Sequence, residues 1–283
     1  MIQTVAQKTG GSIRKVCVVL GEARSSFYHA STPTASQVAD ASLGDLIEAV
    51  FRRHRRRYGY RRLAQELSDR GVSCAPARIR RIMAQRDLHA IQPKTYVPKT
   101  SDGRADKPSP NLISGMPLPS VPDRAWAGDI TFIPTSHGWL YLAVVIDLCS
   151  RRVVGWSLAN HMRSELVLAA LLQALKTRLA NGVIFHSDRG SQYGSIPFRN
   201  ALAEAGLRQS MSARSNPYDN AWTESFIGTL KLEMLQDGCF ENAGDAQTEI
   251  FDYIEGYYNT HRKHSSLGYK TPSQFEAQIH STN

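Results

Sequence analysis

The sequence predicts an α/β fold in which a mixed sheet with flanking helices follows an all-α arm. Three observations support this prediction. The basic charge is confined to the first 110 residues, prolines gather in the middle of the chain, and helical periodicity before them gives way to strand patterns after them. At about 100 to 200 residues per typical domain, 283 residues fit two domains, or one domain with an arm.

The distribution of charge indicates the first class of partner to consider. Residues 1–110 hold 20 Lys and Arg against 9 Asp and Glu, whereas residues 111–283 hold 14 against 16. The net charge of +9 therefore originates in the N-terminal part. A local basic field attracts a polyanion, because each phosphate neutralised by Lys or Arg releases condensed counterions. We expect nucleic acid as the partner.

Proline marks the boundary between the two parts. Seven of the 13 prolines lie within thirty residues and are mixed with Lys, Ser, Asp and Gly, a composition that favours extended backbone over a packed core. We therefore divide the chain into a helical arm (1–91), a Pro-rich linker (92–121) and an α/β domain with C-terminal helices (122–283).

Composition disfavours membrane and secreted proteins. The longest uncharged apolar run, Trp139–Ile146, is far shorter than the ~18 residues of a membrane-spanning helix, and the N-terminal region lacks a secretory signal. We expect a cytoplasmic protein with no membrane partner. Because the four cysteines are too far apart for a CxxC motif or a disulfide framework, we expect buried thiols at Cys17, Cys74, Cys149 and Cys239.

The arm is predicted to contain a helix-turn-helix module. Helices are expected at Ser12–Leu20, from about Phe27, and then at Leu43–His54, Tyr60–Arg70 and Ala75–Gln85. The last three lie in a basic context, and the third of them is the expected recognition helix.

Arginines supply the candidate DNA contacts of this module. The run Phe51–Leu63 holds seven arginines and no acid. Such a run is either a solvated charged face or a phosphate contact, and repulsion between the like charges favours the contact with phosphate. The candidate residues are Arg61, Arg62, Arg78, Arg80 and Arg81.

After the linker, apolar, β-branched and aromatic runs predict strands. The expected order is strands at Trp126–Pro134, Trp139–Asp147 and Arg151–Leu158, a helix at Arg163–Leu179, a strand at Gly182–Phe185, a helix at Ile196–Ala205, a strand near Arg208, and helices at Ala221–Leu235 and Ala243–Asn259 that complete the chain. Three antiparallel strands followed by alternating helices and strands make a mixed sheet covered by helices. This order matches the ribonuclease H-like architecture.

Three acids stand at positions where a carboxylate is costly. Asp129 lies inside an apolar strand, Asp188 follows a strand that is expected to be buried, and Glu224 opens a helix rich in aromatic residues. A buried carboxylate without a counter-charge is strongly unfavourable, and no matched bases accompany these three, which implies a cation. Oxygen-only ligands favour Mg²⁺ or Mn²⁺, and a pair of such ions supports phosphodiester displacement.

The helix that carries Glu224 presents a second group of candidates. At ~100° per residue, Asn220, Gly228 and Lys231 fall near Glu224, and the apolar residues cluster elsewhere. This face suits a metal-bound phosphate, with Lys231 and Asn220 as DNA contacts. The alternative is an exposed face whose acid and lysine never touch.

Other polar residues have simpler explanations. Asp147 fits turn chemistry, Asp219 fits a helix cap, and Glu233 points away from the face of Glu224. His186 is expected to be structural or to support a ligand. No cysteine pair accompanies any histidine pair that could bind zinc, and the chain contains no phosphate-binding GxxxxGK[ST] motif.

The segments around these acids extend over most of the domain. They are Trp126–Thr131 (WAGDIT), Val145–Arg152 (VIDLCSRR), His186–Tyr193 (HSDRGSQY), Asn216–Ser225 (NPYDNAWTES), Lys231 and Tyr258–Leu267 (YNTHRKHSSL), and 35 residues separate Asp188 from Glu224. Together they resemble the OrfB-type transposases of bacterial insertion sequences, whose D,D-35-E catalytic core is similar to retroviral integrase. Tyr58–Leu63 and Arg80–Met83 resemble the helix-turn-helix that precedes this core.

The resemblance implies a function and a set of partners. Asp129, Asp188 and Glu224 would be the metal-binding catalytic triad, with two ions of Mg²⁺ or Mn²⁺, and Lys231 would contact terminal DNA. The implied reaction nicks the ends of the element and then uses the freed 3′-hydroxyl to attack another phosphodiester. The implied partners are double-stranded DNA (terminal inverted repeats and target), a second copy of the chain, and the product of an upstream reading frame, at the bacterial nucleoid.

Two other classes remain open from the sequence. One is a DNA-binding regulator whose catalytic domain is inactive, although the presence of all three carboxylates and of Lys231 argues against it. The other is a nuclease that hydrolyses DNA but never joins it. Strand-transfer products separate the three classes.

Overall fold

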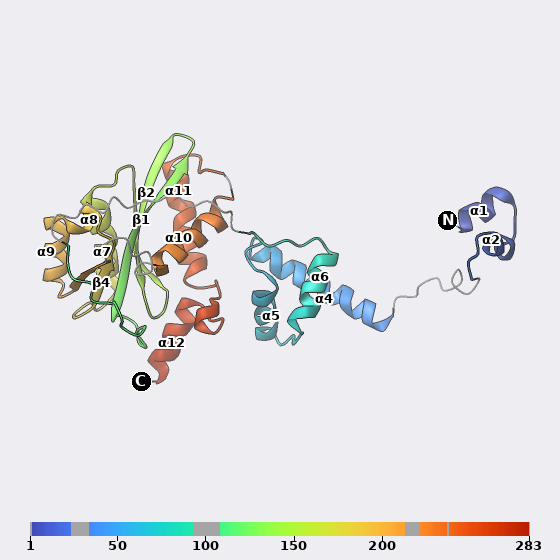
Figure 1. Cartoon of the computed structure of the whole chain (residues 1–283), viewed down its shortest axis with the longest axis horizontal. Coiled ribbons are helices and arrows are strands. Elements are labelled where there is room, and N and C mark those ends of the chain that lie inside the picture. Colours follow the sequence, from blue (N-terminus) through green and yellow to red (C-terminus); the bar gives the residue numbers. More distant parts are fainter. Residues whose placement is uncertain (1, 24–33, 93–107, 213–220, 237, 283) are drawn as a thin grey trace. The chain divides into compact units, whose positions relative to one another are not determined.

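The computed structural model describes residues 2–23, 34–92, 108–212, 221–236 and 238–282, and the chain divides into two units, residues 1–90 and 91–283 (Figure 1). We describe each unit by itself. The helix expected from Phe27, residues 93–107 of the expected linker, Asp219 and Asn220 lie outside the described residues.

The first unit is helical. It contains α1 (Ile2–Thr9), α2 (Ile13–Val19), α4 (Ala35–Arg53), α5 (Tyr60–Asp69) and α6 (Pro76–Gln85). Buried Ile47, Leu63, Leu67 and Ile79 form the core of α4, α5 and α6. The three helices expected for the helix-turn-helix are therefore present.

The first of these helices is longer than predicted. α4 begins at Ala35 rather than at Leu43, because Thr34 and Gln37 form a reciprocal capping box. The Gln37 backbone N–H donates to Thr34 Oγ1 at 3.2 Å, and the Thr34 N–H donates to Gln37 Oε1 at 2.7 Å. α1 was also not predicted.

The second unit contains a five-stranded sheet. Its strands are β1 (Ala125–Thr135), β2 (Gly138–Asp147), β3 (Val153–Ala159), β4 (Ile184–Ser187) and β5 (Arg208–Met211), in the order β3-β2-β1-β4-β5. The first three strands are antiparallel, whereas β4 is parallel to β1 and β5 is parallel to β4. This topology confirms the predicted mixed sheet.

Helices cover both faces of the sheet (Figure 1). They are α7 (Ser164–Thr177), α8 (Ser191–Gly194), α9 (Ile196–Glu204), α10 (Ala221–Met234), α11 (Ala243–Phe251), the π-helix η2 (Asp252–Tyr258), the short 3₁₀ helix η3 (Ser265–Leu267) and α12 (Pro272–Thr282). One apolar core lies under α7, α8 and α9 and includes Trp126 and Phe185. The other lies under α10, α11 and η2 and includes Ile133 and Phe226.

The C-terminal end of the chain differs from the prediction. The expected helix Ala243–Asn259 changes to π-helical geometry at Asp252, and a further helix, α12, follows it. At the start of α12, Thr271 and Gln274 exchange the same pair of hydrogen bonds that begins α4. The prediction that two long helices complete the chain is therefore wrong.

Two further expectations concern cysteines and membranes. All four cysteines are free, but only Cys17 and Cys149 are buried. Cys74 is partly exposed and Cys239 is exposed, because its neighbour Phe240 takes the core position in this connection. The expectation of four buried thiols is wrong. No helix in the described ranges has the length and apolar character needed to cross a membrane.

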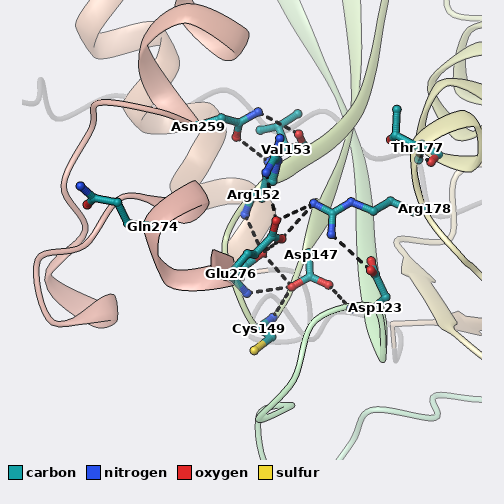
Figure 2. Close-up of polar contacts among 12 residues, drawn as sticks. Asp123, Asp147, Cys149, Arg152, Val153, Thr177, Arg178, Asn259, Gln274 and Glu276 are labelled. Atoms are coloured by element: carbon teal, nitrogen blue, oxygen red, sulfur yellow. Dashed lines mark hydrogen bonds and ion pairs between the residues drawn. The ribbon is translucent and has the colours of Figure 1, made fainter. Parts of the chain in front are cut away.

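A buried polar network fixes α12 to the sheet (Figure 2). The Glu276 carboxylate accepts hydrogen bonds from Arg152 Nη1 at 3.0 Å and from Arg178 Nη2 at 2.8 Å, and Arg178 Nη1 lies 3.2 Å from Asp123 Oδ2. Glu276 also accepts a bond from Ser150 Oγ at 2.7 Å. Because Glu276 is only 5% exposed, its charge depends on these partners.

We predict that Glu276→Ala destabilises the protein by about 3–5 kcal/mol, because it leaves two arginines without their shared buried carboxylate. Urea unfolding measures the difference. The control Glu204→Ala removes an exposed acid of α9 and is expected to change stability by less than about 0.5 kcal/mol. Equal losses in the two variants would contradict the importance of the network.

Candidate active site and nucleic-acid interface

Asp129 and Asp188 come together where the pairing of two parallel strands ends. The last pair of β1 with β4 is Gly128 opposite Ser187, so an aspartate directly follows each of these residues, Asp129 within β1 and Asp188 just after β4. Neighbouring strands lie about 4.8 Å apart. Repulsion by Asp188 accordingly contributes to a raised pKa at Asp129. Strand pairing thus joins two of the three predicted acids, although 58 residues lie between them in the sequence.

The surroundings of Asp129 strongly disfavour its charge. Burial is the largest cause that raises the pKa of Asp129 to about 8, followed by repulsion from Asp188 and, more weakly, from Glu224. The Ile130 N–H and the charge of Lys231 act in the opposite direction. In the metal-free protein, Asp129 is therefore mostly protonated at neutral pH.

Only local backbone groups donate hydrogen bonds to the two aspartates. Among the described residues, Asp129 Oδ1 accepts a bond from Ile130 N at 2.8 Å, and Asp188 Oδ1 accepts one from Gly190 N at 2.9 Å. Within the same residues, neither aspartate forms an ion pair with Lys or Arg. Each therefore keeps an oxygen that can bind a cation.

The glycine before Asp129 allows the close packing behind it. A Cβ at Gly128 would lie 2.6 Å from the Phe185 ring and 3.3 Å from the Tyr193 hydroxyl, so a side chain at this position would displace buried rings. Burial, together with the charges of Asp129 and Asp188, raises the pKa of Tyr193 well above its usual value. Tyr193 therefore lies beneath the acidic pair as a neutral side chain.

The third predicted acid lies on α10. Asp129 is paired with Val144, whose side chain packs with Phe226 and Leu230, so Asp129 is on the face of the sheet that α10 covers. Glu224 is exposed at the start of α10 and raises the pKa of Asp129. The structure thus directs the third acid toward the same site.

Lys231 and Gly228 continue this face of α10. Lys231 is partly buried, and burial lowers its pKa while the charge of Asp129 counteracts that effect. A Cβ at Gly228 would meet no atom within 4 Å, which leaves the gap between Glu224 and Lys231 open. The face therefore presents an acid, an open surface and a cation, as its sequence predicts.

These side chains do not form a closed metal cage. In the part of the chain that the structure describes, no group of three or more His, Cys, Asp or Glu residues is close enough to hold a metal ion. The available donors are nevertheless carboxylate oxygens, Asp129 is desolvated, and neither aspartate has an ion-pair partner among the described residues. This chemistry fits a hard divalent cation at the aspartate pair.

The competing polar residues have structural partners. Asp147 Oδ1 accepts bonds from Cys149 N at 3.0 Å and Ser150 N at 2.7 Å, which confirms turn chemistry. Glu233 is buried and accepts bonds from Arg262 Nη2 at 2.9 Å and Tyr253 Oη at 2.9 Å, away from Glu224.

His186 also has a structural place. Its ring lies between Ser210 Oγ at 2.8 Å and Ser212 Oγ at 3.1 Å, and all three residues are buried. Strand β4 is thereby tied to β5 and to the residue after it. These contacts fit the prediction that His186 is structural or supports a ligand.

In the first unit, several of the predicted arginines have acidic partners. Asp40 of α4 holds both Arg78 at 2.7 Å and Arg81 at 2.6 Å. Arg86 crosses to Asp45 and Glu48, and its guanidinium lies so close to Gly44 that a Cβ there would be 2.3 Å from Nε. Arg78 and Arg81 of α6, together with Arg86 at its C-cap, therefore attach this helix to α4.

Among the described residues, Arg61 and Arg80 contact an aromatic ring instead of an acid. Both are exposed, and their guanidinium carbons lie 5.3 Å and 6.0 Å from the centroid of the Tyr60 ring. Arg62 contacts the Tyr58 ring at 5.8 Å, and its Nη1 donates to the Arg57 carbonyl at 3.5 Å. Arg61 and Arg80 are therefore two exposed cations that both contact the partly buried Tyr60 ring.

Sequence reasoning missed several residues that surround the site. Arg151 and Trp222 contact each other near the start of α10, and Tyr193 lies under the acidic pair. The sequence placed all three in motifs but offered no spacing rule that joins them. The glycine inside β1 was a signal of close packing, since strand interiors rarely use glycine.

Comparisons with known proteins agree with this geometry. Models of the integrase core domain match residues 119–217 and 205–272, and a model of an HTH-like domain matches residues 37–96. The chain is 42% identical over 245 residues to the transposase for insertion sequence element IS904 of Lactococcus lactis, covering 86% of this chain and 97% of that protein. It is 37% identical over 270 residues to transposase InsF for insertion sequence IS3A of Escherichia coli, covering 94% of each.

Among solved structures, the chain is similar to the HTLV-2 integrase catalytic core domain in complex with magnesium. The identity is 21% and the TM-score is 0.42, over 55% of this chain and 97% of that one. The family models and the two relatives confirm the resemblance found in the sequence. The chain belongs to the insertion-sequence transposases with an integrase core, which are DNA polynucleotidyl transferases of the DDE type.

Proposed function

We propose that Asp129, Asp188 and Glu224 are the metal-binding carboxylates with which this transposase nicks the ends of its element and joins the freed 3′-hydroxyl to target DNA. The observation that carries the proposal is that Asp129 and Asp188 directly follow the paired residues Gly128 and Ser187 of parallel β1 and β4, without an ion-pair partner among the described residues. The third carboxylate faces them from α10, and rotation of its flexible side chain would complete the set.

The implied cofactor is a pair of Mg²⁺ or Mn²⁺ ions. Such ions, held about 3.5–4 Å apart, activate the attacking oxygen and stabilise the leaving oxygen of a phosphodiester. The three carboxylates would hold them, and the open surface at Gly228 would admit the DNA backbone. Lys231 would then contact a neighbouring phosphate. Asn220, which lies outside the described residues, is proposed as a DNA contact from the sequence alone.

DNA is the partner that both units support. We propose that Arg61 and Arg80 make phosphate contacts, because they are exposed around Tyr60. Arg62, Arg78 and Arg81 would contact DNA only in addition to their intramolecular partners. The proposed DNA substrates are the terminal inverted repeats and the target site.

The remaining partners follow from the reaction and the family. Joining two ends to one target requires at least two active sites, so we propose a homo-oligomer assembled on DNA. A product of an upstream reading frame is a further proposed partner. The bacterial relatives support a cytoplasmic location, and we propose association with the nucleoid.

We predict that Glu224→Gln abolishes nicking and strand transfer, because the neutral amide cannot replace a carboxylate ligand. Even residues that only support metal ligands change activity by about 10- to 100-fold, so we expect a loss of well over about 100-fold. A plasmid that carries the DNA flanking this coding sequence, incubated with Mg²⁺, reports both steps.

Glu204→Gln, an exposed acid of α9, is the matched control and should retain activity. Undiminished nicking by Glu224→Gln would refute the proposed site. Nicking by the wild-type chain without joined products would instead identify a nuclease, and no cleavage at all would favour a DNA-binding regulator.

We predict that Asp129→Asn stabilises the metal-free protein, by an amount that grows with pH up to about 8. Between the unfolded pKa of about 4 and the native value of about 8, native Asp129 keeps a proton that the unfolded chain has lost. Wild-type stability therefore falls as pH rises through this range, and the variant lacks this dependence.

Thermal unfolding in EDTA from pH 6 to pH 9 measures the effect of Asp129→Asn. Added Mg²⁺ should stabilise the wild type and not the variant, since a cation replaces the proton. Asp252→Asn changes an exposed acid of η2 and should reproduce the wild-type profile. A stability difference that does not vary with pH would contradict the assignment of a buried, protonated Asp129.

We predict different salt dependences for two arginines of α6. Arg80→Ala should lower the affinity for DNA and reduce the slope of log Kd against log salt by about 1, since it removes one phosphate contact. Arg78→Ala should leave the slope largely unchanged and instead lower the stability of the arm, because Arg78 is held by Asp40. Fluorescence anisotropy on a labelled duplex measures the affinity and the salt slope of each variant. A slope reduced in Arg78→Ala but unchanged in Arg80→Ala would contradict the proposal.

A further inference from the structure

Arg151 lies at the end of the turn between β2 and β3, in a backbone conformation that few side chains adopt. Its φ is +62°, in the left-handed region that is costly for residues with a Cβ. The turn imposes this conformation, because Arg151 N donates to the Asp147 carbonyl at 2.9 Å and Asp147 N donates to the Arg152 carbonyl at 2.9 Å. The backbone hydrogen bonds of the turn therefore fix the position of Arg151 independently of its side-chain contacts.

The Arg151 side chain reaches the helix that carries Glu224. Its guanidinium carbon lies 5.7 Å from the centroid of the Trp222 ring. Trp222 is the second residue of α10 and precedes Glu224 by two positions. Its ring also packs against an apolar cluster that includes Ala125 and Ala127 of β1. The ring of Trp222 thus connects the turn, the start of α10 and the strand that carries Asp129.

The contact is desolvated. Arg151 Nη1 is buried and, among the described residues, has no hydrogen-bond partner. Burial also lowers the pKa of Arg151, which is consistent with loss of water from the guanidinium. A cation–π contact is more stabilising when water is excluded. The Trp222 ring therefore offsets part of the desolvation cost of the guanidinium, as a hydrogen-bond acceptor would otherwise do. A DNA phosphate could not reach Nη1 without disrupting this packing.

We propose that Arg151 is a positioning residue that holds Trp222, and thereby orients the first turn of α10 so that Glu224 faces Asp129 and Asp188. This inference rests on the proposed function of the three acids. The turn is itself held by α12, since Ser150 Oγ donates to Glu276. Arg152 pairs with the same carboxylate (Figure 2). The C-terminal helix is thereby linked to the placement of Glu224.

The test measures plasmid nicking and joining as a function of Mg²⁺ concentration, with the plasmid described above. Arg151→Ala should lower the rate by about 10- to 30-fold, the range expected for a desolvated cation–π contact, and should raise the Mg²⁺ concentration at half-maximal rate. Affinity for the DNA in EDTA should not change. Arg151→Lys should lose less activity than Arg151→Ala, and Trp222→Phe should lose less activity than Trp222→Ala.

A double-mutant cycle separates positioning from independent structural effects. Arg151→Ala combined with Trp222→Ala should lose little more activity than the worse single variant, because both remove one contact. Arg208→Ala, an exposed arginine of β5, is the control for loss of charge. Thermal unfolding verifies that each variant is folded at the assay temperature.

Three results would overturn the inference: additive losses in the cycle, an unchanged Mg²⁺ dependence in Arg151→Ala, or a weaker salt dependence of DNA binding, which would identify a phosphate contact. Glu224→Gln is assayed beside these variants. If Glu224→Gln is inactive and Arg151→Ala behaves as wild type, only the positioning role fails. If Glu224→Gln is active, the proposed site itself fails.

Discussion

Two carboxylates held side by side, without an ion-pair partner among the described residues, are the constraint around which this domain is organised. Parallel pairing of β1 and β4 fixes Asp129 beside Asp188, and burial together with repulsion makes the charged pair unfavourable. A fold normally avoids this arrangement, because neutral residues of similar size would be more stable. In the function proposed above, a divalent cation would relieve this unfavourable charge, and the local instability of the metal-free site would then contribute to its affinity for the metal.

In the proposed site, the third carboxylate, Glu224, comes from an element that must be fixed independently. α10 does not pair with the sheet through backbone bonds, so side chains must set its orientation. On its buried side, Phe226 and Leu230 pack on the sheet, and Glu233 is held by the buried Arg262. These contacts fix the middle and end of α10. The first turn of α10 depends on other contacts, and Trp222 is the largest side chain that makes them.

The sequence predicted the sheet, its order of elements and the acids because each depends on local pattern or on a motif with fixed spacing. The missed helix α12 and the missed start of α4 also carried a local signal: both begin with Thr-x-x-Gln, and in both the glutamine side chain returns to the threonine backbone. The capping-box rule would therefore have found them. The change of the C-terminal helix to π geometry at Asp252 has no such signal.

Long-range polar partners could not be predicted in the same way. Nothing in the sequence near Arg178 indicates that it binds Glu276, 98 residues later, or that Arg151 meets Trp222. These pairs depend on how whole helices and strands pack. From the sequence alone, any of several acids could pair with a given arginine. The sequence therefore indicated candidate site residues more readily than the residues that hold them in place.

The same argument changes how the basic charge of the arm should be interpreted. Net charge counts every arginine as available to a polyanion, but Asp40 holds Arg78 and Arg81, and Glu48 is shared by Arg52 and Arg86. These acids lower the local field along α6, the helix first expected to meet DNA. Exposed cations without an acidic partner in the described part of the chain, such as Arg61 and Arg80 around Tyr60, retain their attraction for phosphate. Affinity of the arm for DNA should therefore follow the arrangement of its ion pairs more closely than its total charge.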